Sequence, residues 1–331
     1  MPRVTAQQVA LSAGVSISAV SRTFTEGGSV SPETRARVEA VAAELGYRPN
    51  QLARGLMTGR TRLVGVVLAG VDDPLHALAL ARIVERLQLL GLHALLARLD
   101  TEPGSGGALD MLLQYQVDAA LLVGATLPDG FARECQRASV PALHLFGRRA
   151  ARNVVPVIGA DEAAAAAEVA RLFIGAKLKR IACITDDAGS DRITSFAETC
   201  AGARVAAPPI ASVDAASADD GRRAALRLLG AARTPQALFC TDDRLAHGAL
   251  DACRELGLAV PEQVAIVGWG DLDGAAGGNG NGALSTVRPP VAAMVDDAVS
   301  RIGHTLATPG GARLSGKRHG CELLQRATTP G

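Results

Sequence analysis

A segment near the start of the chain carries side chains that could read the base edges of DNA. Residues 17–24 are expected to form a helix that Ser16 caps. The exposed positions of this helix are Ile17, Ser18 and Arg22, which are short or end in a guanidinium. An arginine can donate two hydrogen bonds to guanine O6 and N7 in a DNA major groove. These side chains therefore suit a helix that enters the groove.

Residue types that commonly carry catalysis are scattered along the chain. The six histidines and six cysteines form no compact motif, and no two cysteines have the C-x-x-C spacing of metal or redox sites. The sequence also lacks the HExxH, Gly-x-Ser-x-Gly and Gly-Lys-Ser/Thr motifs of zinc proteases, hydrolases and phosphate-binding loops. We therefore expect no enzyme, no cofactor and no metal site, with the cysteines buried as free thiols.

Three short helices are predicted to position the segment that could read DNA. Thr5 and Gln8 form a capping box before the first helix, and Gly14 allows the left-handed turn that ends it. Ser31 and Pro32 mark the start of a third helix. Two helices joined by a tight glycine turn are typical of a helix-turn-helix unit, although a plain three-helix bundle shares this pattern.

Charge and length fit a small basic unit attached to a larger body. Residues 1–62 contain eight arginines and four glutamates, a net charge of +4, so the remaining residues carry −3 of the overall +1. A basic head on a mildly acidic body fits nucleic-acid contact at one end. With 331 residues, of which 48% are hydrophobic and 3% aromatic, the chain should form two or three units with aliphatic cores.

From residue 63 onward, apolar strands alternate with helices. Strands are predicted at 63–68, 93–99, 117–123 and 141–146, and in the second half at 180–185, 237–240 and 264–268. The helices between them are predicted at 78–90, 164–173, 220–229 and 246–256. This rhythm predicts a two-lobed α/β domain with parallel sheets. Ligands of such folds bind at the carboxyl ends of the strands.

Two further features bear on location and assembly. The chain has no signal-peptide pattern and no run of 18 apolar residues, so we expect a soluble, cytoplasmic protein. It has no apolar heptad tail, which favours a homodimer over a tetramer. A transport-type solute-binding protein is the alternative, because it shares the two-lobed architecture. Such a protein would need a signal peptide and would lack the basic head.

Many spaced residues within the first fifty form one pattern. They are Val4-Thr5, Val9-Ala10, Ala13-Gly14-Val15-Ser16, Val20-Ser21-Arg22, Val30-Ser31, Leu45-Gly46-Tyr47 and Pro49-Asn50. This pattern resembles the DNA-binding head of the LacI/GalR family of transcriptional regulators. The resemblance implies that Ile17, Ser18 and Arg22 read base edges. It also implies phosphate anchors, which position the helix without reading sequence, at Thr5, Ser16 and Ser21.

The next segment, residues 49–61, resembles the hinge of that family, which is helical only on operator DNA. By this resemblance Leu56 wedges into the minor groove at the centre of a palindromic site, with Ala53 beside it and Asn50 among the DNA contacts. Gly55 departs from the family pattern. A glycine inside a helix costs about 0.5–1 kcal/mol relative to alanine, so hinge folding would depend more on DNA. An ordinary linker between domains is the alternative.

The resemblance extends through the α/β region to about residue 325. Its strongest stretches are residues 238–250, 255–262 and 265–271, and residues 284–288 match the crossover between lobes. The division that it implies is a helix-turn-helix domain at 1–48, a hinge at 49–62 and an effector-binding domain at 63–331. Lobe one would comprise 63–157 and 288–310, and lobe two would comprise 158–287 and 311–331.

The same resemblance implies an effector pocket between the lobes. Its residues would be Leu75, His76, Arg148, Arg192, Asp242 and Asp271. An arginine fork can clamp a carboxylate or vicinal oxygens, and aspartates accept from hydroxyls, so the effector would be a sugar or a sugar acid. Arg192 could instead form a salt bridge at the rim of the cleft. Asp243 is expected only to cap the following helix.

The combined expectation is a sequence-specific DNA-binding transcriptional repressor. It would bind double-stranded DNA at a pseudo-palindromic operator as a homodimer, under the control of a sugar or sugar-acid effector held between two α/β lobes. Gly270-Asp271, together with Cys240-Thr241 and Cys253, is similar to gluconate-type regulators of the family. That similarity favours a sugar acid.

Overall fold

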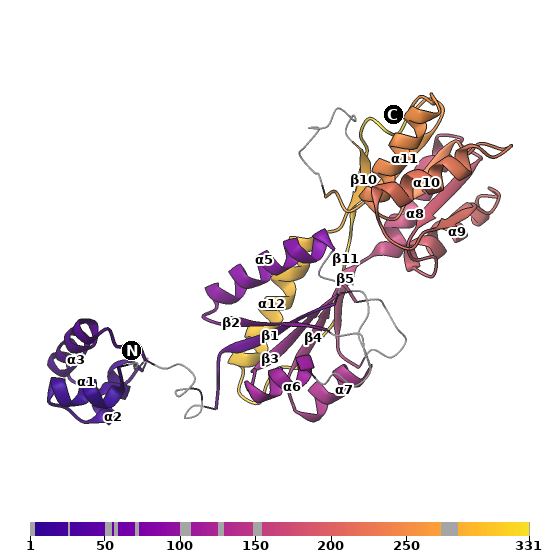
Figure 1. Cartoon of the computed structure of the whole chain (residues 1–331). Coiled ribbons are helices and arrows are strands. Elements are labelled where there is room, and N and C mark those ends of the chain that lie inside the picture. Colours follow the sequence, from indigo (N-terminus) through magenta and orange to yellow (C-terminus); the bar gives the residue numbers. More distant parts are fainter. Residues whose placement is uncertain are drawn as a thin grey trace. The chain divides into compact units, whose positions relative to one another are not determined.

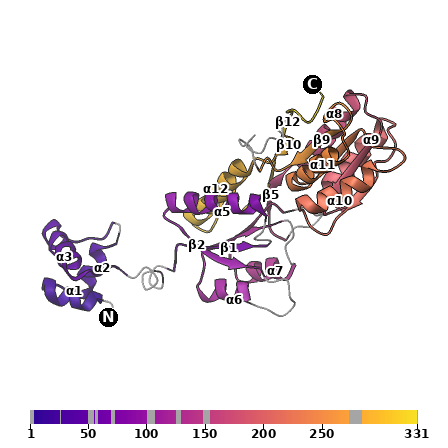
Figure 2. The same ribbon diagram turned by 45° about the horizontal axis from the view of Figure 1, so that its top comes forward.

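The computed structural model describes residues 4–25, 27–49, 55, 59–69, 73–99, 107–124, 129–147, 154–272 and 284–330. The chain divides into two compact units, Met1–Arg62 and Leu63–Gly331 (Figure 1). The described part of the small unit is helical. The large unit is an α/β unit with two sheets, which Figure 2 shows from a second direction.

Three helices form the described core of the small unit. They are α1 (Ala6–Ala13), α2 (Ile17–Thr23) and α3 (Pro32–Leu45). Their buried residues pack into one cluster made of Val9, Ala10, Ala13, Val20, Val38 and Ala42. Short helices are marginal alone, so this shared aliphatic core is what stabilises them. The predicted order of three helices is confirmed.

Local capping sets the ends of these helices. The Thr5 hydroxyl accepts from the Gln8 backbone N–H, and the Gln8 side chain accepts from the Thr5 N–H at 2.9 Å, which is the predicted capping box. Gly14 ends α1 in the left-handed region with φ 61°. Ser16 and Ser31 each accept from a backbone N–H three residues on, at 3.2 Å, and so cap α2 and α3.

Sheet A of the large unit has the strand order β11-β5-β4-β3-β1-β2, with parallel pairings. Its strands are β1 (Leu63–Leu68), β2 (His93–Arg98), β3 (Ala119–Val123), β4 (Ala142–Leu145), β5 (Val157–Ala160) and β11 (Lys317–His319). Helices α5 (Pro74–Leu89) and α12 (Val291–Ala307) cover one face. Helices α6 (Gly107–Gln114) and α7 (Asp129–Arg137) cover the other.

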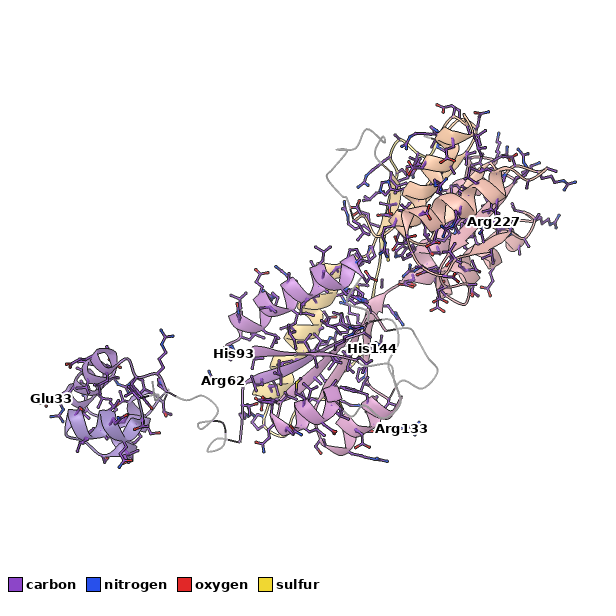
Figure 3. The ribbon with its side chains drawn as sticks, in the orientation of Figure 1. Glu33, Arg62, His93, Arg133, His144 and Arg227 are labelled. Carbon is purple, nitrogen blue, oxygen red and sulfur yellow. The ribbon has the colours of Figure 1, made fainter. Side chains whose placement is uncertain are left out.

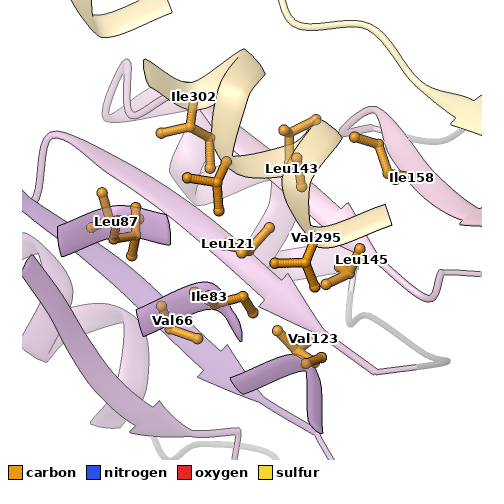
Figure 4. Close-up of a cluster of buried hydrophobic side chains, with 14 of the residues drawn as sticks. Val66, Ile83, Leu87, Leu121, Val123, Leu143, Leu145, Ile158, Val295 and Ile302 are labelled. Carbon is orange, nitrogen blue, oxygen red and sulfur yellow. The ribbon is translucent and has the colours of Figure 1, made fainter. Parts of the chain in front are cut away.

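The core of lobe one is aliphatic and continuous across the sheet. Figure 4 shows Leu121 and Leu143 from the strands facing Ile83 of α5 and Val295 of α12. All four side chains are fully buried. A parallel sheet is covered on both faces, so its strands read as unbroken apolar runs, and this is why the sequence pattern predicted them.

Sheet B has the strand order β12-β10-β9-β8-β6-β7, and only β12 runs antiparallel among its described pairings. Its strands are β6 (Ile181–Thr185), β7 (Ile210–Ser212), β8 (Ala237–Cys240), β9 (Ala265–Trp269), β10 (Ser285–Arg288) and β12 (Glu322–Leu324). Helices α8 (Glu162–Gly175) and α9 (Asp191–Gly202) cover one face. Helices α10 (Ala218–Leu229) and α11 (Asp243–Glu255) cover the other.

The sheets correct the predicted lobe boundaries. The predicted change of lobe between residues 157 and 158 falls inside β5, which pairs with β4 in sheet A. The C-terminal segment 311–331, assigned wholly to lobe two, gives β11 to sheet A and β12 to sheet B. The strand β11 is Lys-Arg-His, which carries no apolar signal, so hydropathy could not place it. The placing of α12 with lobe one agrees with its packing.

Two general expectations can be compared with the structure. No helix in the described ranges is long and apolar enough to cross a membrane. The six cysteines are unpaired; five are buried and Cys321 is partly exposed, so the prediction of buried free thiols is confirmed for five. Burial raises the pKa of Cys135 and of Cys253 to about 11, which keeps both as inert thiols.

Candidate DNA interface and effector site

The outer face of α2 gathers the side chains predicted to read bases. Ile17, Ser18, Ser21 and Arg22 are all exposed, and Ile17 leaves 52% of its surface to solvent although it is apolar. The opposite face of α2 buries Ala19, Val20 and Thr23 in the core. Positions i, i+1, i+4 and i+5 share one side of a helix, so these four residues can meet one surface together. This side of α2 therefore presents two hydroxyls, one guanidinium and one apolar side chain to solvent.

The predicted phosphate anchors lie at helix starts. Thr5 and Ser16 are both exposed N-caps, of α1 and α2. The Ser16 hydroxyl lies 2.9 Å from that of Ser18, so one pair of hydroxyls links the predicted phosphate and base contacts. Ser21 lies one turn further along α2 and is also exposed. The small unit therefore brings all six of its described candidates to the surface.

The far end of α2 is held by a close turn. A Cβ added to Gly28 would lie 2.1 Å from the carbonyl oxygen of Arg22, so only glycine fits there. Arg35 of α3 donates to the carbonyl oxygens of Thr23 and Gly28, the latter at 3.1 Å. Arg35 thus holds the end of α2 in place. Two of its N–H donors are used within the small unit and are not free to contact DNA.

Four predicted site residues lie outside the described residues. They are Asn50, Ala53 and Leu56 of the hinge, and Arg148 of the effector pocket. Their assignments stay predictions.

Arg192 lies at the start of α9, just beyond the carboxyl end of β6. Its guanidinium donates to both carboxylate oxygens of Glu162, at 2.9 and 3.0 Å, and to the carbonyl oxygen of Thr241 at 2.8 Å. The guanidinium carbon also lies 4.5 Å from the centre of the Trp269 ring, a cation–π contact. The side chains of Arg192 and Glu162 keep only 25% and 29% of their surface exposed.

The electrostatics of Arg192 follow from these contacts. Burial by itself would lower the pKa of the guanidinium, but the carboxylate of Glu162, with Asp186 and Asp242 nearby, holds that pKa above its ordinary value. The group is a permanent cation with three of its N–H directions already used. The alternative of a salt bridge is therefore realised, and a ligand would have to share or displace Glu162.

Asp242, and not Asp243, caps the helix α11. Asp242 is the N-cap of α11, and its carboxylate accepts from the backbone N–H of Arg244 at 2.7 Å and from the Arg244 guanidinium at 2.9 Å. Asp243 was expected to be the cap, and this was wrong. Its buried carboxylate accepts from Thr286 at 2.6 Å and from the Leu272 N–H at 3.0 Å. Burial raises the pKa of Asp243.

Asp271 lies between two arginines. One carboxylate oxygen accepts from Arg288 and the other from Arg326, each at 2.7 Å, and only 4% of the side chain is exposed. Arg326 also donates to the carbonyl oxygen of Leu284 at 2.9 Å, so the set ties the end of β9 to the C-terminal segment. Both carboxylate oxygens of Asp271 therefore already have charged partners, and its contact with an effector stays a prediction.

Leu75 and His76 lie in the first turn of α5, beyond the carboxyl end of β1 in lobe one. The His76 ring packs 5.2 Å from the ring of Phe146, which follows β4, and its Nε2 lies 3.9 Å from a carboxylate oxygen of Asp73. His76 is nearly buried, whereas Leu75 is half-buried. Both belong to the edge where the parallel strands of sheet A end, which is the predicted position for ligand contact.

Three residues beside the predicted contacts Arg192 and Asp242 of lobe two were missed by sequence reasoning: Glu162, Arg244 and Trp269. Each neutralises or stacks on a predicted residue, and pairings across 30 residues or more leave no local spacing in a sequence. Arg244 had a local signal, because it lies two residues after Asp242. Among the described residues, no group of three or more His, Cys, Asp or Glu side chains could hold a metal ion.

A cavity of about 860 Å³ lies at the opposite edge of sheet A, where strands begin. Its wall includes Pro141 before β4, Pro156 before β5 and Arg313 in the loop after α12. Arg318 of β11 also lines it. The cavity is separate from the carboxyl end of β1, beyond which Leu75 and His76 lie on α5.

Both units match known protein families. Residues 5–50 match the model of bacterial regulatory proteins of the lacI family, and residues 170–329 match a periplasmic binding protein-like domain. The chain is thus a DNA-binding transcriptional regulator built from a helix-turn-helix unit and a two-lobed α/β domain. It belongs to the LacI family.

Individual relatives agree with that assignment. The HTH-type transcriptional repressor CytR of Escherichia coli K12 is 29% identical over 279 residues, 81% of this chain and 80% of CytR. The lac repressor dimer bound to operator and the anti-inducer ONPF superposes with a TM-score of 0.88 at 24% identity, over 100% of both chains. The regulator CelR in complex with cellobiose gives 0.69 at 25% identity, over 98% of this chain and 100% of CelR.

Proposed function

We propose that this regulator is a cytoplasmic repressor that binds a pseudo-palindromic operator as a homodimer and changes its DNA affinity when a sugar or sugar acid binds between its lobes. It acts by binding, without catalysis. The observation that carries the proposal is the exposed face of α2, where Ser18, Ser21 and Arg22 stand free of the core on a helix fixed by Arg35. The operator-bound lac repressor supports the same mode of action.

The homodimer is supported by an apolar surface on lobe one. Four large side chains on α5, on the turn after it and on β2 are between 48% and 69% exposed: Leu78, Leu89, Leu90 and Leu96. The strand β2 is also the edge of sheet A, so its outer backbone groups have no neighbouring strand in the sheet. Exposed apolar patches of this kind mark association surfaces, and a two-fold axis would pair the patch with itself.

The lobes are joined by three segments, which is where an effector would act. The chain crosses between β5 and α8, between β10 and α12, and between β11 and β12. Two crossings are bonded to each other, because the Asp161 N–H donates to the carbonyl oxygen of His319 at 2.7 Å. Cys321 packs against the cores of both lobes. A ligand that favours one lobe arrangement would shift the population of that arrangement and, through it, DNA affinity.

The proposed effector contacts are Leu75, His76 and Arg148 from lobe one, with Arg192 and Asp242 from lobe two. Asp242 keeps lone pairs that can accept from sugar hydroxyls while Arg244 holds its position. Asp271 is proposed to brace β9 through its two arginines. The cellobiose complex of CelR supports a sugar as the ligand class.

The test is DNA binding by the full chain to its own upstream region, at fixed salt, with and without a panel of sugars and sugar acids. We expect one palindromic site to bind and one compound to change its affinity. Binding of a sugar without binding of any DNA would favour the alternative, a plain sugar-binding module of the solute-binding class.

A further inference from the structure

A guanidinium to which the described residues supply no charged partner lies at the carboxyl edge of sheet A. Arg318 is the central residue of β11, and its Nη1 donates to the carbonyl oxygen of Ala160, the last residue of β5, at 3.2 Å. Its Nη2 is removed from solvent and has no hydrogen-bond partner. A buried donor without an acceptor is unfavourable, so a ligand oxygen at this point would be bound strongly.

Two glycines make room for this guanidinium and for the histidine beside it. A Cβ on Gly159 would lie 2.4 Å from Arg318 Nη1, and a Cβ on Gly147 would lie 2.3 Å from His144 Nδ1. Any other residue at either position would push a polar side chain aside. Because Gly147 and Gly159 have no side chains, the His144 ring and the Arg318 guanidinium can lie directly against the backbone at the ends of β4 and β5.

His144 is a neutral neighbour of Arg318. Its Nε2 lies 2.7 Å from the carbonyl oxygen of Gly124, so Nε2 carries the proton and Nδ1 is left as an acceptor. Burial lowers the pKa of His144, the Gly124 carbonyl opposes this, and the charge of Arg318 lowers the pKa further. Figure 3 labels His144 on the sheet of lobe one. Of these two residues, only Arg318 is therefore charged.

The two lobes differ in how their arginines are neutralised. In lobe two, Glu162 pairs with Arg192 and Asp242 with Arg244. Over the described ranges, Arg318 forms no ion pair with any carboxylate. Lobe two therefore offers an effector mainly acceptors for hydroxyls, while lobe one offers a cation with a spare donor.

We propose that Arg318 determines effector specificity by receiving an oxyanion, so that the effector is a polyol carrying a carboxylate or phosphate, with that group toward lobe one and its hydroxyls toward Asp242. This rests on the proposed function, because it assumes an effector between the lobes. A guanidinium matches either oxyanion with two parallel hydrogen bonds, and the low local dielectric strengthens them.

The experiment measures ligand affinity of the full chain by calorimetry with matched probes: D-glucose, D-gluconate and D-glucose 6-phosphate, and the galactose equivalents. Inorganic phosphate against chloride at equal ionic strength, followed by melting temperature, serves as the minimal oxyanion. We expect an anionic member of a set to bind at least 10-fold tighter than its neutral sugar. Carboxylate and phosphate probes then show which oxyanion is preferred.

The decisive variant is Arg318→Met. It should weaken the anionic ligand about 10- to 100-fold, the range of a charge-assisted hydrogen-bond pair, and leave the neutral sugar unchanged. Arg313→Met is the matched control. Arg313 and Arg318 both line the cavity at the other edge of sheet A, so this variant shows whether an anion binds in that cavity instead. Equal losses for neutral and anionic ligands, or a loss of anion binding in Arg313→Met instead, would overturn the assignment.

A second variant covers a failure of Arg318→Met to fold. Gly159→Ala keeps the charge but places a methyl 2.4 Å from Nη1, so it should also weaken the anion selectively. Unchanged anion affinity in Gly159→Ala contradicts the inference. If operator DNA binds and neutral sugars alone change its affinity, the proposed function stands and the role of Arg318 falls. If neither DNA nor any probe binds, the proposed function itself has failed.

Discussion

The proposed DNA-reading face, which is the exposed side of α2, and the proposed effector edge, which is the carboxyl edge of sheet B, hold their polar side chains in opposite ways. On α2, the serines and Arg22 project from a closed aliphatic core into solvent. At the carboxyl edge of sheet B, Arg192 and Arg244 each have a carboxylate within 3.0 Å. The first surface is ready for an outside partner, whereas the second is a set of internal pairs that a ligand must exchange with. We therefore expect DNA binding to add contacts to α2, and effector binding to replace existing ion pairs of Arg192 and Arg244.

The largest effect should come from breaking an internal pair. Glu162→Gln removes the charge that neutralises Arg192, which leaves a mostly buried cation, and we expect a loss of about 2–3 kcal/mol in the free energy of unfolding of the large unit. Urea unfolding followed by circular dichroism measures this. Glu134→Gln, which removes the partner of the exposed Arg137, is the matched control and should change nothing measurable. Equal losses of stability in the two variants would mean that the mostly buried pair contributes no more than the exposed pair.

The next largest effect is expected on the exposed face of α2. Arg22→Ala should cost about 1–3 kcal/mol of operator binding and relax one base position, with no change in the stability of the small unit. Binding to operators with single base changes, at fixed salt, measures it. Arg37→Ala on α3 is the control for loss of one exposed charge. Uniformly weaker binding with unchanged base preference would reduce Arg22 to a phosphate contact.

The stability of lobe one is expected to depend on pH through His144, which among the described residues has no charged partner of the kind that pairs the arginines of lobe two. Because the pKa of folded His144 is below its ordinary value of 6.5, the unfolded chain takes up a proton that the folded chain refuses as the pH falls through 6.5. Stability is therefore retained above that pH and lost below it, by up to about 1.4 kcal/mol per pH unit. His144→Gln, which can still donate to Gly124, should flatten the difference between pH 7.5 and pH 5.5. Parallel pH profiles for variant and parent would contradict this.

The smallest effect is expected on the outer surface of lobe two. Arg223 of α10 contacts Asp219 and Asp220, four and three residues away, and Arg223 and Asp219 keep 55% and 59% of their side-chain surface exposed. Arg223→Gln should leave the urea midpoint unchanged, because exposed pairs on a helix are screened by water. A clear loss of stability would mean that even exposed pairs contribute here, and the contrast with Glu162 would be one of degree.

Sequence reasoning succeeded where the signal was local. Capping at Thr5, Ser16 and Ser31 fixed the start of each helix of the small unit, because a cap and its N–H lie three residues apart. Continuous apolar runs likewise predicted the strands β1, β2, β3, β4, β6, β8 and β9, whereas the short strands β5, β7, β10, β11 and β12 were not predicted. Local rules could not decide between Asp242 and Asp243, since a shift of one residue in the start of α11 exchanges cap and core.

Sequence reasoning failed where partners are distant in the chain. Arg318 lies in the sequence Lys-Arg-His, which carries no apolar signal, yet its guanidinium contacts Ala160, 158 residues away. The two arginines that donate to the Asp271 carboxylate are Arg288 of β10 and Arg326 of the segment after β12. Such pairings depend on which strands become neighbours, and sheet order is set by the whole fold.

The three crossings between the lobes limit which parts of this protein can be exchanged with those of a relative. The small unit joins the rest of the chain once, next to Arg62, so one junction suffices to exchange it for that of a relative. Exchange of either lobe would require three matched junctions at once, two of which share the bond from Asp161 to His319. Recombination within the family should therefore shuffle DNA specificity freely, while each pair of lobes is inherited as a single block.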